Sequence, residues 1–125
     1  MQIHIDSRGY SAKPKNEMSL IKPRLQSDKN LKKVTVTELA NYIEKGYTIS
    51  PGVMRDGAKA ENWISQQLFM VDVDNEKADR DILTEAEALY ICQENNIRPA
   101  FYYHSFSHTE DKPKYRLCFV MDKAT

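Results

Sequence analysis

The sequence has no apolar run that approaches the ~20 residues of a membrane-spanning helix. Its first residues, Met1 to Asp6, also lack the basic start and the long apolar core of a signal peptide. We therefore expect a cytoplasmic chain without a membrane segment. The length of 125 residues corresponds to about one domain.

Cysteine is scarce, and this limits the metal sites and cross-links that the chain can form. Cys92 and Cys118 are the only cysteines, and both lie inside apolar patterns. A zinc site built from a cysteine cluster needs more of them. We interpret the two residues as small buried thiols rather than as a disulfide.

The sequence also lacks an excess of charge of either sign, because 18 basic side chains balance 18 acidic ones. A strongly basic domain, typical of non-specific nucleic-acid binding, is therefore excluded. The charges are nevertheless unevenly placed, since residues 8–33 are mostly basic. We interpret residues 1–34 as a short strand followed by a basic, partly irregular arm, which either is solvated or faces nucleic acid.

Residues 35–125 carry the regular patterns and form the expected core. Thr37 and Gly46 are the expected limits of a first helix, and Thr84 with Glu87 predicts the start of a second. Alternation and composition predict strands at 67–74, 100–106 and 114–121, the last two joined as a hairpin. This order predicts an α+β fold: a partial RNA-recognition-motif-like (ferredoxin-like) sheet with helices packed on one face.

A complete unit of that kind needs one more helix and strand. Either the N-terminal elements complete the sheet, or the chain is part of a longer protein, and we favour the second alternative.

Two aspartates end the apolar strand at 67–74. Residues i and i+2 of a strand point to the same face, so Asp72 and Asp74 aim two carboxylates at one place. Two neighbouring negative charges are costly unless a cation or a substrate uses them, and Mg²⁺ prefers carboxylate oxygens together with substrate phosphates. The pattern favours a phosphate-handling metal site. The alternative is a strand that simply turns polar at the surface.

Polar side chains at the next strand end could complete such a site. Ser105, Ser107 and His108 follow the second strand, and their hydroxyl and imidazole groups can donate to phosphate oxygens. Arg116 lies on the return strand, and its planar fork suits a triphosphate. His104, within the strand, is interpreted as structural.

Three short blocks follow one another along the chain: Phe69–Asn75 (FMVDVDN), Phe101–His108 (FYYHSFSH) and Pro113–Val120 (PKYRLCFV). Together they resemble the archaeo-eukaryotic primase superfamily, and most closely the primase-polymerase-like replication proteins of phages, plasmids and mobile elements. The resemblance covers roughly residues 35–122. It implies an N-terminal part of a DNA-directed primase or polymerase with an RNA-recognition-motif-like core.

The resemblance also implies roles for single residues. Asp72 and Asp74 would be catalytic and bind Mg²⁺ or Mn²⁺, and His108 would be catalytic through the phosphates of the incoming nucleotide. Arg116 would be a supporting basic contact. The implied partners are nucleoside triphosphates, a single-stranded DNA template and a replicative helicase.

The family also uses a third acidic residue on a later strand. Asp122 follows His108 too soon to be that residue, so we expect the third carboxylate beyond Thr125 and no activity from these residues alone.

Two functions from different classes follow. The first is metal-dependent nucleotidyl transfer on a DNA template. The second is a non-catalytic module that binds nucleic acid or a replication partner, in which Tyr102, Phe106 and Tyr115 would stack on bases.

Overall fold

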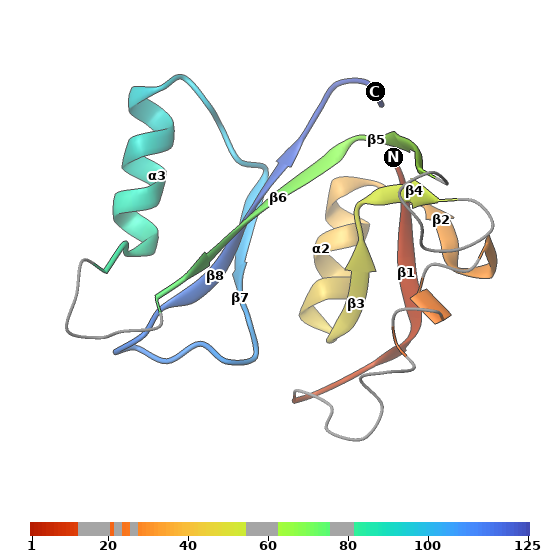
Figure 1. Ribbon diagram of the computed structural model, residues 1–125, viewed down its shortest axis with the longest axis horizontal. Helices are drawn as coiled ribbons and strands as arrows, with labels where there is room; N and C mark the ends of the chain where they lie inside the picture. The colour runs from red at the N-terminus through yellow and green to blue at the C-terminus, as the bar shows by residue number, and fades with distance from the viewer. Residues whose placement is uncertain (13–20, 22–23, 26–27, 55–62, 76–81) are drawn as a thin grey trace. The chain divides into compact units, whose positions relative to one another are not determined.

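The computed structural model describes residues 1–12, 21, 24–25, 28–54, 63–75 and 82–125 (Figure 1). Over these residues the chain is a mixed α+β structure with helices α2 and α3 and small antiparallel sheets, which confirms the α+β class of the prediction. The chain divides into two compact units, residues 1–69 with 121–125, and residues 70–120. Much of the expected basic arm, including Lys13, Lys15 and Lys22, lies outside the described residues.

The first unit is organised around strand β1 (Gln2–Gly9). This strand lies between β2 (Leu31–Lys33), which follows a short 3-10 helix η1 (Asp28–Asn30), and β3 (Tyr47–Ser50). Both neighbours pair with it antiparallel. Ile3 and Ile5 are fully buried in β1, so the start of the chain belongs to a packed core. Strands β4 (Gly52–Met54) and β5 (Trp63–Gln66) form a separate antiparallel pair.

Helix α2 (Val36–Glu44) starts two positions earlier than the sequence pattern indicates, because its N-cap is Thr35 and not Thr37. The Thr35 hydroxyl accepts the backbone N–H of Glu38, and the Glu38 carboxylate accepts the backbone N–H of Thr35. Gly46 ends the helix as predicted. Its φ of 85° lies in the left-handed region, and a Cβ there would meet the carbonyl oxygen of Tyr10 at 1.7 Å.

The second unit contains the predicted strand, helix and hairpin. Strand β6 (Leu68–Asp74) begins in the first unit and leads through residues 75–84 to helix α3 (Glu85–Glu94), which is followed by β7 (Phe101–His104) and β8 (Lys114–Val120). The strand order is β6-β8-β7, so the last strand lies between the two that α3 connects. Asn96 has a φ of 56° just beyond α3, in agreement with the predicted end at Asn95 and Asn96.

Strands β6 and β8 run antiparallel (Figure 1). Asn75 N donates to Pro113 O at one end of the pair, and Met121 N donates to Gln67 O at the other. In this register Asp72 lies opposite Arg116, and Asp74 lies opposite Lys114. The pairing therefore decides which charges of the two strands meet.

One face of this sheet packs on α3. Ala88, Tyr115 and Leu117 form the buried core of the unit, with Val73 among the residues packed against it. The Tyr115 hydroxyl lies within hydrogen-bond distance of two carbonyl oxygens just before α3, those of Leu83 and Thr84, at 2.9 and 3.0 Å. The core thus fixes the start of α3 against β8.

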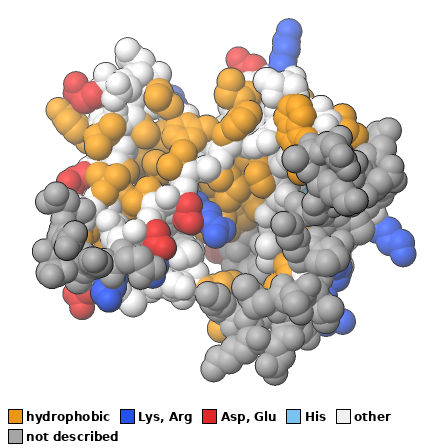
Figure 2. All heavy atoms as spheres, viewed as in Figure 1, with side chains coloured by type: hydrophobic (Ala, Val, Ile, Leu, Met, Phe, Trp, Pro, Cys, Tyr) orange, Lys and Arg blue, Asp and Glu red, His pale blue; other side chains and the backbone are white. Residues whose placement is uncertain are grey.

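Hydrophobic side chains also reach the surface (Figure 2). The exposed ones include Tyr90 and Ile91 on α3 and Trp63 and Ile64 on β5.

Among the described helices, none has the length and apolar character that crossing a bilayer requires. Cys118 is buried and Cys92 is half-buried, and neither forms a disulfide.

Candidate functional site

Asp72 and Asp74 lie on the same side of β6, as the two-residue period predicts. Val73 points the other way, into the core beneath α3. The two carboxylates therefore belong to the face of the sheet that is turned away from α3, which we call the carboxylate face. Their side chains are 60% and 48% exposed, so both can meet a ligand from solvent.

Strand β8 places two cations opposite these carboxylates. Lys114 Nζ lies 3.3 Å from Asp74 Oδ1, and Arg116 Nε lies 3.5 Å from Asp72 Oδ1. These are cross-strand pairs, which follow from the antiparallel register. The Asp72–Arg116 pair is exposed, and pairs of this kind contribute only ~0–1 kcal/mol, so these two groups can exchange partners at small cost. Lys114 is more buried, with 16% of its side chain exposed.

Tyr103 on β7 holds the guanidinium of Arg116 from the other side. Arg116 Nη1 donates to the Tyr103 hydroxyl over 3.1 Å, and the guanidinium carbon lies 5.9 Å from the centre of the ring. Burial raises the pKa of Tyr103 above its ordinary value, although the hydrogen bond from Arg116 acts in the opposite direction. Tyr103 therefore stays neutral, and its hydroxyl orients the guanidinium of Arg116 without placing a negative charge beside it.

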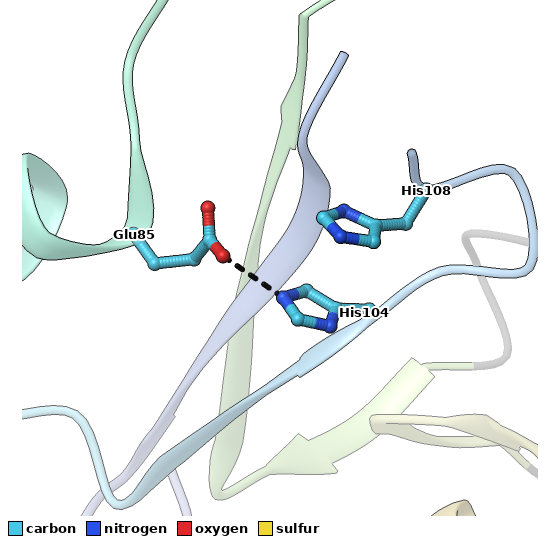
Figure 3. Close-up of side chains that lie close together, drawn as sticks. All are labelled: Glu85, His104 and His108. Carbon is cyan, nitrogen blue, oxygen red and sulfur yellow. Dashed lines mark hydrogen bonds and ion pairs between the residues drawn. The ribbon is translucent and has the colours of Figure 1, made fainter. Parts of the chain in front are cut away.

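A second group of polar side chains gathers at the start of α3 (Figure 3). His104 Nε2 lies 3.0 Å from Glu85 Oε2. The rings of His104 and His108 are stacked, with centroids 3.7 Å apart and planes inclined by 6°. We call Glu85, His104 and His108 the histidine cluster. The hydrogen bond from His104 holds the pKa of the Glu85 carboxyl below its usual value.

The hairpin loop fixes His108 in this cluster. The backbone N–H of Lys114 donates to His108 Nδ1 over 3.1 Å, and the backbone N–H of His108 donates to Ser105 O. A neutral ring whose Nδ1 accepts a hydrogen bond carries its proton on Nε2. In the neutral form His108 therefore offers an Nε2–H donor.

The candidate residues from the sequence thus fall into two groups. Asp72, Asp74 and Arg116 come together on the carboxylate face. His108 instead stacks on His104, and β7 pairs His104 with Tyr115, whose side chain lies in the core on the α3 side. The structure brings His108 to Glu85 and His104 rather than to the aspartates.

The two serines lie around the same hairpin. Ser105 is half-buried, and its backbone N–H donates to Lys114 O. Ser107 is exposed in the loop. The β7–β8 register continues to the hydrogen bond between Ser105 and Lys114, so Ser105 lies opposite Lys114, on the same side of the hairpin as Tyr103 and Arg116.

Sequence reasoning missed Glu85 and assigned His104 a structural role, whereas the His104 side chain is 44% exposed. A weak signal was present. Thr84 as N-cap makes Glu85 the first residue of α3, where its side chain can reach a neighbouring strand end.

Comparisons of this chain with models of protein families, with curated proteins and with solved structures found no match.

Proposed function

We propose that this chain is the N-terminal portion of a primase-polymerase-type replication protein that carries out metal-dependent nucleotidyl transfer on a DNA template. The observation that carries the proposal is the carboxylate face, where two exposed aspartates of one strand lie opposite two cations of the next. Carboxylates for a hard cation next to donors for phosphate oxygens are what phosphoryl chemistry requires. The sequence resemblance supports the same assignment.

For the fold, we propose that β6, α3, β7 and β8 are the first three strands and first helix of an RNA-recognition-motif-like unit. The strand order β6-β8-β7 supports this, because the strand that follows the hairpin returns to the middle of the sheet. In this arrangement the side of β6 that faces away from β8 would accept a further strand. A third carboxylate on that strand would lie next to Asp72 and Asp74.

The residues present suit Mg²⁺ or Mn²⁺, which take carboxylate oxygens and share phosphate oxygens with a substrate. Asp72 and Asp74 would hold the cation, which would stabilise negative charge on the phosphates. Lys114 and Arg116 would then leave the aspartates and pair with the triphosphate, and Tyr103 would keep the guanidinium aligned.

His108 takes a different part in this proposal than the resemblance alone implies. Its ring lies with Glu85 and His104, so the triphosphate is assigned first to Arg116 and Lys114. A contact from His108 to a phosphate would use its Nε2–H and would require the hairpin loop to move. The full activity further needs nucleoside triphosphates, a single-stranded template and, in the cell, a replicative helicase as partner.

Neutral variants of the two aspartates test the proposed metal site. Asp72→Asn and Asp74→Asn should each abolish nucleotide incorporation in the full-length protein, because an amide cannot replace a carboxylate at the cation. The measurement is primer synthesis and extension with Mn²⁺ or Mg²⁺, with circular dichroism to show that the variants fold. Asp111→Asn, in the exposed hairpin loop, is the matched control. Normal synthesis by either strand variant would refute the assignment.

The second candidate function is a non-catalytic module that binds single strands. Tyr102 and Phe106 favour it, since their side chains are 42% and 53% exposed and can stack on bases. Tyr115, the third aromatic expected to stack, is fully buried in the core and cannot do so. Divalent ions separate the two functions. A stacking module binds single-stranded DNA without them and loses affinity as salt rises, whereas the transfer site needs Mn²⁺ to bind a nucleoside triphosphate.

A further inference from the structure

We propose that Glu85, His104 and His108 form a second metal site, which takes a borderline divalent cation of the Zn²⁺ class. One potential ligand atom from each side chain lies within 4.8 Å of the other two. The side chains come from the first turn of α3, the end of β7 and the following loop, and they point toward one another (Figure 3). This proposal does not depend on the proposed function.

The chemistry of the three donors selects the ion. Two imidazole nitrogens and one carboxylate oxygen are a frequent ligand set of Zn²⁺ and of Fe²⁺, and they leave a coordination position open for water or substrate. Mg²⁺ prefers oxygen ligands and suits the carboxylate face better. The chain would thus separate a hard cation at Asp72 and Asp74 from a softer one at the histidine cluster.

Binding requires a small rearrangement of the rings. The parallel rings of His104 and His108 direct their lone pairs side by side, so one ring must turn before both can reach a single ion. The nitrogen and oxygen ligands of a tetrahedral Zn²⁺ lie ~2.0–2.2 Å from the metal, so the three atoms must also approach one another. His104 has room to turn, because its side chain is 44% exposed, and the turn exchanges its stacking on His108 for a bond to the ion.

His108 supplies a direct reporter of occupancy. Its Nδ1 accepts the backbone N–H of Lys114. If Nδ1 binds the ion, this acceptor is lost. If Nε2 binds the ion, the proton moves to Nδ1, which again cannot accept. Either mode of binding therefore releases the Lys114 amide, and no cation at Asp72 and Asp74 has that effect on the ring.

The test is a titration of the folded chain with Zn²⁺, monitored by calorimetry and by the backbone amide signals in NMR. We expect one ion per chain and a shift of the Lys114 amide together with the signals of Glu85, His104 and His108. Glu85→Gln, His104→Gln and His108→Gln should each weaken binding at least about tenfold, since even partners outside the ligand sphere contribute about 10–100-fold.

Two control variants locate the site. Glu94→Gln, at the far end of α3, and Asp72→Asn, on the carboxylate face, should leave the affinity for Zn²⁺ unchanged. The proposal is overturned if the folded chain binds no Zn²⁺, if the glutamine variants bind as tightly as the parent, or if the Lys114 amide does not respond. If only Asp72→Asn lost binding, the Zn²⁺ ion would be bound at the carboxylate face, and the proposal would be overturned as well.

Discussion

Asp6 and Arg24 form an ion pair in the first unit that neither residue's place in the sequence reveals. Arg24 donates to both carboxylate oxygens of Asp6, over 2.5 and 2.7 Å, and also to the Tyr10 hydroxyl. The Asp6 side chain has no exposed surface. A buried charge is tolerated only when it is paired and hydrogen-bonded, so this pair is a requirement of the fold.

The protonation of Asp6 follows from these contacts. Burial alone would raise the pKa of Asp6, but the hydrogen bond and charge of Arg24, with the backbone N–H groups of Ser7 and Arg8, outweigh it and hold the pKa below 3.8. A lowered folded-state pKa contributes stability that is fully present above the unfolded value. That contribution is lost as the pH falls below 3.8 toward the folded pKa.

Arg24→Met should therefore destabilise the chain by about 3 kcal/mol near neutral pH, because it leaves a buried carboxylate without its partner. The penalty should already shrink at a pH above the ordinary range of a free aspartate, because burial without Arg24 raises the pKa of Asp6 and the carboxyl becomes protonated in the variant first. Urea unfolding at several pH values measures both effects. Lys29→Met, which removes an exposed cation of η1, is the control and should cost little. A penalty that does not change with pH would contradict the role given to Asp6.

At the residue scale, the sequence predicts the side of a strand to which a side chain points better than it predicts which distant residue that side chain contacts. Alternation along β6 placed Asp72 and Asp74 on one side of the strand, because the strand period is local. The partner of His108 could not be predicted in this way. It depends on the path of the hairpin loop and on the start of α3, which are set by tertiary packing.

At the scale of elements, the helix caps are the clearest link between sequence and structure. Both helices begin after a threonine whose hydroxyl accepts the backbone N–H three residues later. For α3 this residue, Thr84, was predicted. For α2 the sequence offers Thr35 and Thr37, and only Thr35 is followed by glutamate at the third position, as a capping box requires.

Replacement of the two threonines tests this assignment. Thr35→Ala should lower the free energy of unfolding by about 1 kcal/mol, because it leaves helix N–H groups without an acceptor. Thr37→Ala lies inside α2 and should be neutral or slightly stabilising, since alanine is the better helix former. Thermal and urea unfolding of both variants give the comparison. Equal effects of the two substitutions would show that the cap contributes nothing.

The strand pairing is the element-level feature that matters most for the candidate site. The sequence predicted β6, β7 and β8 within a few residues, together with the β7–β8 hairpin. It did not predict the β6–β8 register, which places Asp72 opposite Arg116 and Asp74 opposite Lys114. Register depends on the fit of Val73 and Tyr115 beneath α3, and that fit is a property of the packed unit.

At the scale of the whole molecule, the described chain has two cores. Ile3, Ile5 and Leu39 are fully buried in the first unit, and Tyr115 and Leu117 are buried in the second. Each core joins buried strand residues to a helix residue of its own unit, Leu39 of α2 in the first and Ala88 of α3 in the second. A cavity in one core should therefore destabilise its own unit first.

Leu117→Ala should lower the free energy of unfolding of the 70–120 unit by about 3 kcal/mol, as expected for a large-to-small change at a buried leucine. Hydrogen exchange followed by mass spectrometry should show the greatest loss of protection in α3, β7 and β8. Ile91→Ala is the matched control, because Ile91 is 49% exposed and should change protection little. A loss of protection concentrated in β1 and α2 would contradict the division into two cores.

The sequence by itself determined several local features of this protein: the two helices, the cap of α3 at Thr84, the strands β6, β7 and β8 with their hairpin, and the common direction of Asp72 and Asp74. These depend on hydrogen bonds and periodicities within a few residues. Only the tertiary structure decided which distant side chains meet: Arg24 with Asp6, Arg116 with Asp72, and His108 with His104 and Glu85. Such contacts are set by strand register and by the packing of helix on sheet, which no short stretch of sequence specifies.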